Sequence, residues 1–144
     1  MVIGADAKSV MATVGDLHSW PKWTVWLHEL DPSVEVHFGD TPEGPELRYL
    51  GKKLGRGRFV VIEDKSPAEI TVRAEMTDTG SAGLHRFQIE EDESGTRLVW
   101  SMMGDAGDSF LSSLTVGTRE RLAVRDFDQS LTSLKTCIEQ GRCP

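Results

Sequence analysis

The stretch from Thr118 to Gln140, TRERLAVRDFDQSLTSLKTCIEQ, decides the fold. Apolar side chains recur along it at alternating steps of three and four residues, and polar or charged side chains fill the positions between them. This apolar stripe consists of Val124, Phe127, Leu131, Leu134 and Ile138. The spacing predicts an amphipathic helix roughly 35 Å long, at about 1.5 Å per residue, with one face that must be buried.

Upstream of this helix, the sequence changes to the two-residue alternation of β-strands. The clearest case lies within 68–77, where Ile70, Val72 and Ala74 fall on one face and polar or charged residues on the other. Further strands are predicted at about 34–38, 45–51, 57–65, 84–92 and 96–103, bounded by Gly, Pro, Asp or Ser. Because one face is apolar and the connections are short, we expect an antiparallel sheet.

Two small helices precede these strands, after a very short strand at the first three residues. One would run from Asp6, its cap, to Gly15, and the other from Leu17 to Trp20, where Pro21 ends it. An open sheet of six to seven strands with one apolar face needs a cover, and the last helix is long enough to provide it. The predicted fold is therefore α+β, with the sheet curled round the C-terminal helix and residues 1–144 forming a single domain.

Composition excludes several classes of function. The chain has 144 residues and 16 Lys+Arg against 23 Asp+Glu, a net charge of −7. An acidic balance repels phosphate backbones and acidic membrane surfaces, so we expect no nucleic-acid partner. The longest strongly apolar run, Phe59 to Ile62, is far too short to span a membrane. Asp6 and Lys8 interrupt any secretory signal, so we expect a cytoplasmic protein.

The cysteines and histidines do not suggest a cofactor. Cys137 and Cys143 lie close together at the C-terminal end, where they could form a disulfide, but free thiols are expected in a cytoplasm. The four histidines are dispersed along the chain, so no metal site is predicted. No motif for a nucleotide cofactor is complete either.

Several short pieces, in this order and spacing, resemble the START/SRPBCC superfamily and, within it, the polyketide cyclase/dehydrase family. They are Ile3-Gly-Ala-Asp-Ala with Val10, Asp16 with Trp20 and Trp23, Tyr49-Leu-Gly with Gly57, Ile62 and Pro67, Gly95-Thr-Arg-Leu-Val-Trp100, and Asp126-Phe127 with Leu131, Leu134-Lys135 and Glu139. The resemblance implies a helix-grip fold with an elongated apolar cavity between sheet and helix. It also implies a small hydrophobic ligand such as a lipid, steroid or polyketide. The family's first strand is normally longer than Met1 to Ile3.

Two side chains could bring acid–base chemistry to such a cavity. His85 shares strand parity with Phe87 and should face inward, and an ordinary histidine pKa of about 6.5 suits proton transfer at neutral pH. The alternative is a histidine hydrogen-bonded near a strand end. Tyr49 shares parity with Leu47 and should also face inward, either to contact ligand or as a core tyrosine satisfied by the backbone.

Aromatic and methionine side chains could form the cavity wall or simply fill the core. Trp20, Trp23 and Trp26 recur at helical spacing, and the segment from Gly104 to Ser113 is polar enough to be a mobile flap. Methionine walls adapt to ligands of variable shape. The candidate ligand contacts are Trp23, Trp26, Tyr49, Met76, His85, Phe87, Trp100, Met102, Phe110 and Phe127.

Three functions remain open at this point. The favoured one is binding of a small hydrophobic ligand in the cavity. The second is a cofactor-free cyclase/dehydratase in which His85 and Tyr49 supply the acid and base, and such an enzyme needs polar groups that converge on one point. The third is a protein-interaction module like the chaperone co-activators of the same superfamily, which would need an exposed apolar groove.

Overall fold

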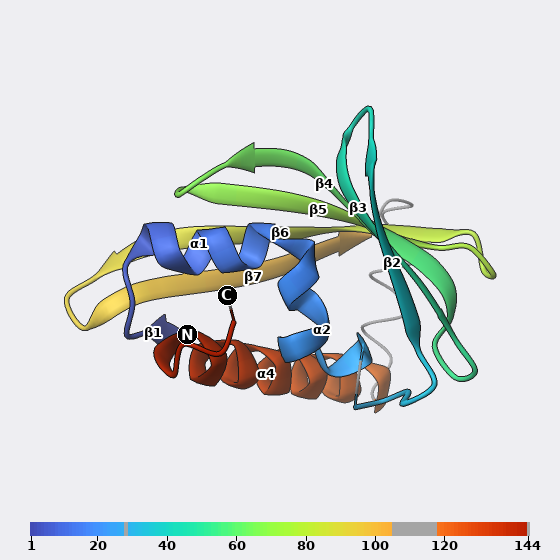
Figure 1. Cartoon of the computed structure of the whole chain (residues 1–144). Coiled ribbons are helices and arrows are strands. Elements are labelled where there is room, and N and C mark those ends of the chain that lie inside the picture. Colours follow the sequence, from blue (N-terminus) through green and yellow to red (C-terminus); the bar gives the residue numbers. More distant parts are fainter. Residues whose placement is uncertain (28, 105–117, 144) are drawn as a thin grey trace.

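The strands form a single curled antiparallel sheet in the order β1-β7-β6-β5-β4-β3-β2 (Figure 1). The computed structural model describes residues 1–27, 29–104 and 118–143, and their side chains except those of 91, 104 and 118–126. The strands are β1 (Val2–Ile3), β2 (Glu35–Thr41), β3 (Gly44–Gly51), β4 (Gly55–Lys65), β5 (Glu69–Met76), β6 (Ser81–Asp92) and β7 (Gly95–Gly104). The helical elements are α1 (Ala7–Gly15), the 3-10 turns η1 (Leu17–Ser19) and η2 (Val25–Leu27), α2 (Trp20–Trp23) and α4 (Thr118–Glu139).

The α+β prediction is confirmed, and every predicted strand is present with ends that differ by a few residues. Strands β2 to β7 pair in sequence order through short turns, as expected for hairpins. The first strand is as short as the sequence predicts and adds two residue pairs to β7. The amino group of Met1 reinforces it by donating to the Leu98 carbonyl over 3.0 Å.

The first helix begins and ends where the sequence predicts. Asp6 caps α1 by accepting a hydrogen bond from the Ser9 N–H over 2.6 Å. The second helix differs from the prediction, because Pro21 does not end it. Proline lies in the first turn of α2, where its missing N–H removes no helical hydrogen bond, and the helix continues to Trp23.

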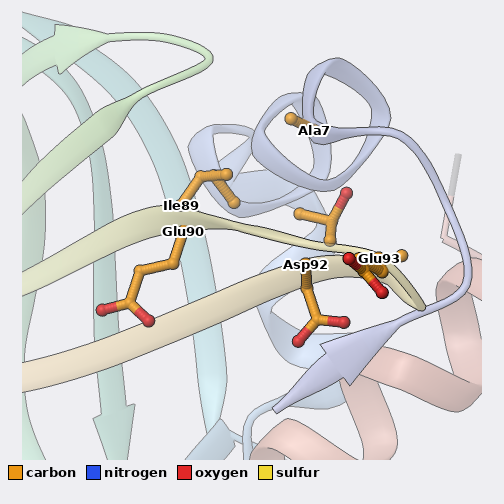
Figure 2. Close-up of a pocket in the computed structure, with 7 residues that line it drawn as sticks. Ala7, Ile89, Glu90, Asp92 and Glu93 are labelled. Atoms are coloured by element: carbon orange, nitrogen blue, oxygen red, sulfur yellow. The ribbon is translucent and has the colours of Figure 1, made fainter.

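The hairpin between β6 and β7 carries a run of four acidic residues, Glu90 to Glu93. A shallow hollow of about 550 Å³ lies between this hairpin and the start of α1 (Figure 2). In that view Ile89 points toward α1, whereas the Glu90 carboxylate points away from it. Glu90 and Glu93 are exposed to solvent.

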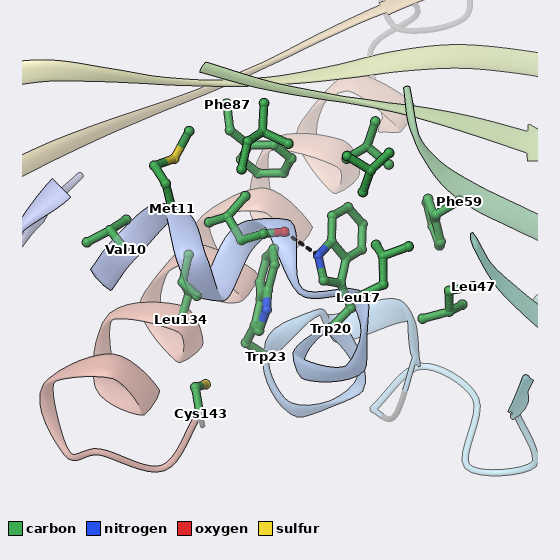
Figure 3. Packing of buried hydrophobic residues seen from close by; sticks show 14 of the residues in the cluster. Val10, Met11, Leu17, Trp20, Trp23, Leu47, Phe59, Phe87, Leu134 and Cys143 are labelled. Carbon is green, nitrogen blue, oxygen red and sulfur yellow. Dashed lines mark hydrogen bonds between the residues drawn. The ribbon is translucent and has the colours of Figure 1, made fainter. Parts of the chain in front are cut away.

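The concave face of the sheet is filled first by the short helices and only then covered by α4. Trp20 is fully buried, donates its indole N–H to the Val14 carbonyl over 2.8 Å, and packs against Trp23, Phe59 and Phe87 (Figure 3). The sequence predicted direct packing of the whole apolar stripe on the sheet. In the structure the contacts are mixed, because α4 packs mainly on α1, α2, η2 and the edge strand β1, while its Phe127 ring stacks on Trp100 of β7.

Within the apolar stripe of α4, burial varies by residue. Leu134 is fully buried, Phe127, Leu131 and Ile138 are half-buried, and the Val124 side chain is outside the described part. A buried polar contact also holds α4, since the Ser130 hydroxyl accepts a hydrogen bond from the Val25 N–H over 3.0 Å. This anchor joins the long helix to η2, one wall of the cavity described below.

The convex face of the sheet carries a network of ion pairs. Arg48 points outward, as its strand parity predicts, and its Nε lies 2.6 Å from Glu46. Arg58 binds the same carboxylate from 2.8 Å and also pairs with Glu75. Hydrogen bonds from the two arginines hold the pKa of Glu46 below its ordinary value. The charges therefore lie on the face opposite the cavity.

The expectation of free thiols is wrong in this structure, which joins Cys137 and Cys143 in a disulfide. The turn after α4 explains their proximity. Gly141 has φ +66°, its N–H donates to the Ile138 carbonyl, and the Arg142 N–H donates to the Cys137 carbonyl over 2.7 Å. These are the two hydrogen bonds of a Schellman motif, and they fold the tail back on the helix.

Reduction of this disulfide is expected to lower the free energy of unfolding by at most about 2 kcal/mol, because the bridge closes a very short loop. Urea unfolding with and without a phosphine reductant measures the difference. The Cys137→Ser/Cys143→Ser variant serves as the control, since reductant should not alter its unfolding. Two alkylatable thiols in the freshly purified, non-reduced protein would contradict the pairing.

Candidate functional site

An apolar cavity of about 220 Å³ lies on the concave side of the sheet. Strands β3 to β7 form its walls, and Trp26 on η2 contributes from the helical layer. Its described lining residues are Trp26, Tyr49, Leu54, Phe59, Ala74, Met76, Ala82, Gly83, His85 and Met102. Apart from Tyr49 and His85, these side chains are apolar or aromatic, so the cavity favours hydrophobic molecules.

Tyr49 projects inward from β3 and is 6 % exposed. Its ring lies against Gly57 on the paired strand β4, where a Cβ would collide with the phenol. Glycine at 57 therefore makes room for the ring. Burial, with a smaller contribution from the Asp78 charge, raises the pKa of Tyr49 above its ordinary value. The hydroxyl stays protonated at neutral pH and can donate to a ligand.

His85 projects inward from β6 and is 3 % exposed. Its Nδ1 accepts a hydrogen bond from the indole Nε1 of Trp100 over 3.0 Å. Burial lowers the pKa of His85 to about 4, so the ring is neutral at neutral pH. The residue combines both interpretations of the sequence, because it is hydrogen-bonded within the protein and also lines the cavity.

Aromatic rings surround His85 on several sides. Ring centroids lie 5.9 Å away for Trp26, 6.1 Å for Phe59 and 5.7 Å for Trp100. Phe127 of α4 adds a fourth ring at 6.2 Å. These rings come from η2, β4, β7 and α4, so His85 lies where the helical layer meets the sheet.

Phe59 lies between the two polar groups of the cavity. Its ring centroid is 5.5 Å from that of Tyr49 and 6.1 Å from that of His85. The structure thus brings the two predicted acid–base residues to one cavity but places an aromatic ring between them. The arrangement allows two separate hydrogen bonds to one ligand.

The predicted ligand contacts divide into three groups. Trp26, Tyr49, Met76, His85 and Met102 line the cavity. Trp23 and Phe87 are fully buried in the core, while Trp100 and Phe127 stack on each other beside His85 and are absent from the described lining. Phe110, with the predicted flap, lies outside the described residues.

The sequence analysis missed five lining residues, which are Leu54, Phe59, Ala74, Ala82 and Gly83. Strand parity could have found Phe59 and Ala74, since both alternate with inward neighbours and oppose each other across β4 and β5. Ala82 and Gly83 precede the predicted start of their strand at 84. Leu54 lies in a turn, where alternation carries no information.

Two observations concern ions and membranes. Among the side chains described, no three His, Cys, Asp or Glu residues come close enough together to hold a metal ion. No helix in the described part of the chain is both long and apolar enough to cross a membrane.

A curled antiparallel sheet closed by a long C-terminal helix, with an apolar cavity on its concave side, defines a helix-grip protein. The chain belongs to the family described as polyketide cyclase / dehydrase and lipid transport, whose profile matches residues 1–139. This confirms the resemblance noted in the sequence.

Solved structures of low sequence identity share the fold. Ms6760 from Mycobacterium smegmatis has a TM-score of 0.66 at 14% identity, covering 98% of this chain and 88% of that one. The Aha1 dimer from Colwellia psychrerythraea has a TM-score of 0.59 at 17% identity, covering 99% and 94%. The di-domain ARO/CYC StfQ from the steffimycin biosynthetic pathway has a TM-score of 0.65 at 14% identity, covering 97% of this chain and 49% of its own length. No curated protein matches the sequence.

Proposed function

We propose that the protein binds a small hydrophobic molecule, of the lipid, steroid or polyketide kind, in the cavity between the curled sheet and the helical layer. The observation that carries this proposal is the cavity itself, an apolar space of about 220 Å³ with aromatic walls and two polar groups. When the cavity is empty, the atoms that line it lack van der Waals partners. A bound apolar ligand would supply those contacts. The family description, which includes both polyketide cyclases and lipid transport, supports the same class of ligand.

The chemistry of His85 and Tyr49 favours binding over catalysis. A general base works best when its pKa lies near the working pH, whereas burial lowers the pKa of His85 to about 4. The raised pKa of Tyr49 makes its phenol a weak acid. A cofactor-free cyclase/dehydratase that uses the same two residues remains a hypothesis, and a pH-dependent turnover lost in His85→Gln would support it.

The interaction-module alternative has less support from the described surface. Its large exposed apolar side chains are Leu30, Phe38, Leu50, Met76 and Met103. They come from five different segments of the chain, and Phe38 is stacked on His18 at 4.0 Å. Scattered exposed apolar residues are ordinary on a protein surface.

Filling the cavity should abolish ligand binding without unfolding the protein. Ala74 lines the cavity and is half-buried, so Ala74→Leu would place extra methyl groups in the space that a ligand needs. We expect the affinity for N-phenyl-1-naphthylamine, a neutral lipophilic fluorophore, to fall roughly tenfold or more. Titration of the probe fluorescence gives the dissociation constant.

The matched control is Ala68→Leu, the same substitution at an exposed position in the β4–β5 turn. It should leave probe affinity unchanged. Equal affinity in the Ala74→Leu variant and the native protein would place the bound probe elsewhere and overturn the proposed site. Absence of probe binding to the native protein would overturn the proposed function itself.

A further inference from the structure

We propose that Trp100 is a positioning residue that holds His85 as a hydrogen-bond donor, so that the cavity selects hydrophobic ligands with a carbonyl or similar oxygen acceptor. The inference deepens the proposed function and rests on it for the ligand. The state of His85 itself can be tested without any ligand.

The Trp100 ring is oriented by stacking from two different elements. It lies 4.3 Å from the Phe127 ring of α4 with an interplanar angle of 10°. It also lies 5.0 Å from the Phe87 ring, its register partner on β6, with an angle of 29°. Phe87 is fully buried, so this side of the stack has little freedom to move. The indole N–H is thereby held toward His85.

The direction of this hydrogen bond determines the tautomer of His85. An indole nitrogen can only donate, so the Nδ1 of His85 must be the acceptor in the 3.0 Å contact. A neutral imidazole with an unprotonated Nδ1 carries its proton on Nε2. In a doubly protonated ring, the Nδ1–H of His85 would point at the indole N–H of Trp100, which is unfavourable. The lowered pKa of His85 agrees with this, because it keeps the ring neutral at neutral pH. His85 therefore offers the cavity a donor and not a basic lone pair.

The second polar group of the described lining is compatible with this preference. The Tyr49 hydroxyl can donate or accept. The described lining contains no carboxylate, Lys or Arg. A ligand carbonyl finds donors in this cavity, whereas an ammonium group finds no counter-charge. The expected ligand is thus a neutral, largely apolar molecule with at least one oxygen acceptor.

The tautomer can be read directly by nuclear magnetic resonance. In long-range ¹H–¹⁵N spectra of the ligand-free protein at pH 7, we expect His85 with a protonated Nε2 and an unprotonated Nδ1. Trp100→Phe keeps an aromatic ring but removes the donor, and should yield a mixture of tautomers. The control is Trp23→Phe, which removes another indole of the same aromatic cluster, one that donates to Ser19. A protonated Nδ1 in the native protein would overturn the role of Trp100.

Ligand selection is tested with fluorenone and fluorene, which share a ring skeleton and differ by the carbonyl. Competition against N-phenyl-1-naphthylamine should show that fluorenone binds roughly 2- to 12-fold more tightly, the value of one hydrogen bond. The preference should become smaller in Trp100→Phe and persist in Trp23→Phe.

Equal affinity of the two competitors for the native protein would overturn the inferred selectivity while leaving cavity binding intact. Failure of both competitors to displace a bound probe would also overturn the inferred selectivity and leave cavity binding intact. Failure of the probe itself to bind would instead refute the proposed function, and the ligand-free spectrum would then decide the role of Trp100 by itself.

Discussion

Truncation of Leu134 to alanine is expected to lower the free energy of unfolding by about 2–5 kcal/mol, the usual cost of a large-to-small change in a core. Leu134 is fully buried and faces Trp23 across the interface between α4 and the short helices (Figure 3). The change would leave a space that neither the helix nor the fully buried Trp23 can easily fill. Urea unfolding followed by circular dichroism measures the loss.

Leu131→Ala provides the matched control on the same helix. Leu131 belongs to the same apolar stripe but is only half-buried, so its truncation should cost less than that of Leu134. A change of less than about 0.5 kcal/mol for Leu134→Ala is typical of a surface position and would contradict the packing of α4.

The second large effect concerns acid. Stability is expected to fall by roughly 3 kcal/mol between pH 7 and pH 4 because of His85 alone. Burial lowers the pKa of this residue from 6.5 in the unfolded chain to about 4 in the folded protein. Between these values the unfolded chain binds a proton that the folded protein does not, so unfolding becomes easier as the pH drops. Below about pH 4 both states are protonated and the contribution no longer changes.

The His85→Gln variant isolates this effect. The Gln side-chain oxygen can still accept from Trp100 but does not titrate, so the variant should lose little stability between pH 7 and pH 4.5. The groups in ring contact with His85 are Trp26, Phe59, Trp100 and Phe127, and Tyr49 is the other titratable residue of the cavity lining. The same pH slope in both proteins would show that His85 is not buried in neutral form.

Carboxylates begin to lose their stabilising contribution only toward the acid end of this range, and they do so equally in both proteins. Asp31 is an example, since its carboxylate accepts hydrogen bonds from the N–H groups of Leu54, Lys53 and Ser33. These contacts hold the pKa of Asp31 well below its ordinary value. Its stabilising contribution is present above the ordinary aspartate pKa and is lost only as the pH falls through and below that value.

The two-residue period of the strands accounts for the cavity residues that the sequence could predict. Strand parity alone directed Tyr49 and His85 to the concave face, and both line the cavity. Parity could not separate His85 from Phe87, which has the same parity but is fully buried in the core. The difference depends on α1 and α2, which fill the sheet beside Phe87 and leave space beside His85. How far α1 and α2 fill the concave face depends on tertiary packing and not on the local sequence.

The disulfide and the Pro21 helix show a related limit. Cys143 follows Cys137 by six positions, but only the turn around Gly141 brings their Cα atoms to 5.2 Å. Judged from its ring alone, Pro21 predicts the end of a helix. It lies in the first turn of α2 instead, where the buried rings of Trp20 and Trp23 flank it.

The sequence by itself determined the kind and order of the elements and the face on which each side chain lies. These properties depend on neighbours within a few residues, through the periods of strand and helix. Tertiary structure alone decided how deep each inward residue lies, where packing leaves a cavity, and that the Trp100 indole meets His85 across the β6–β7 hairpin. The physical reason is that cavities and tautomers depend on volumes and hydrogen bonds contributed by distant segments, which no local period encodes.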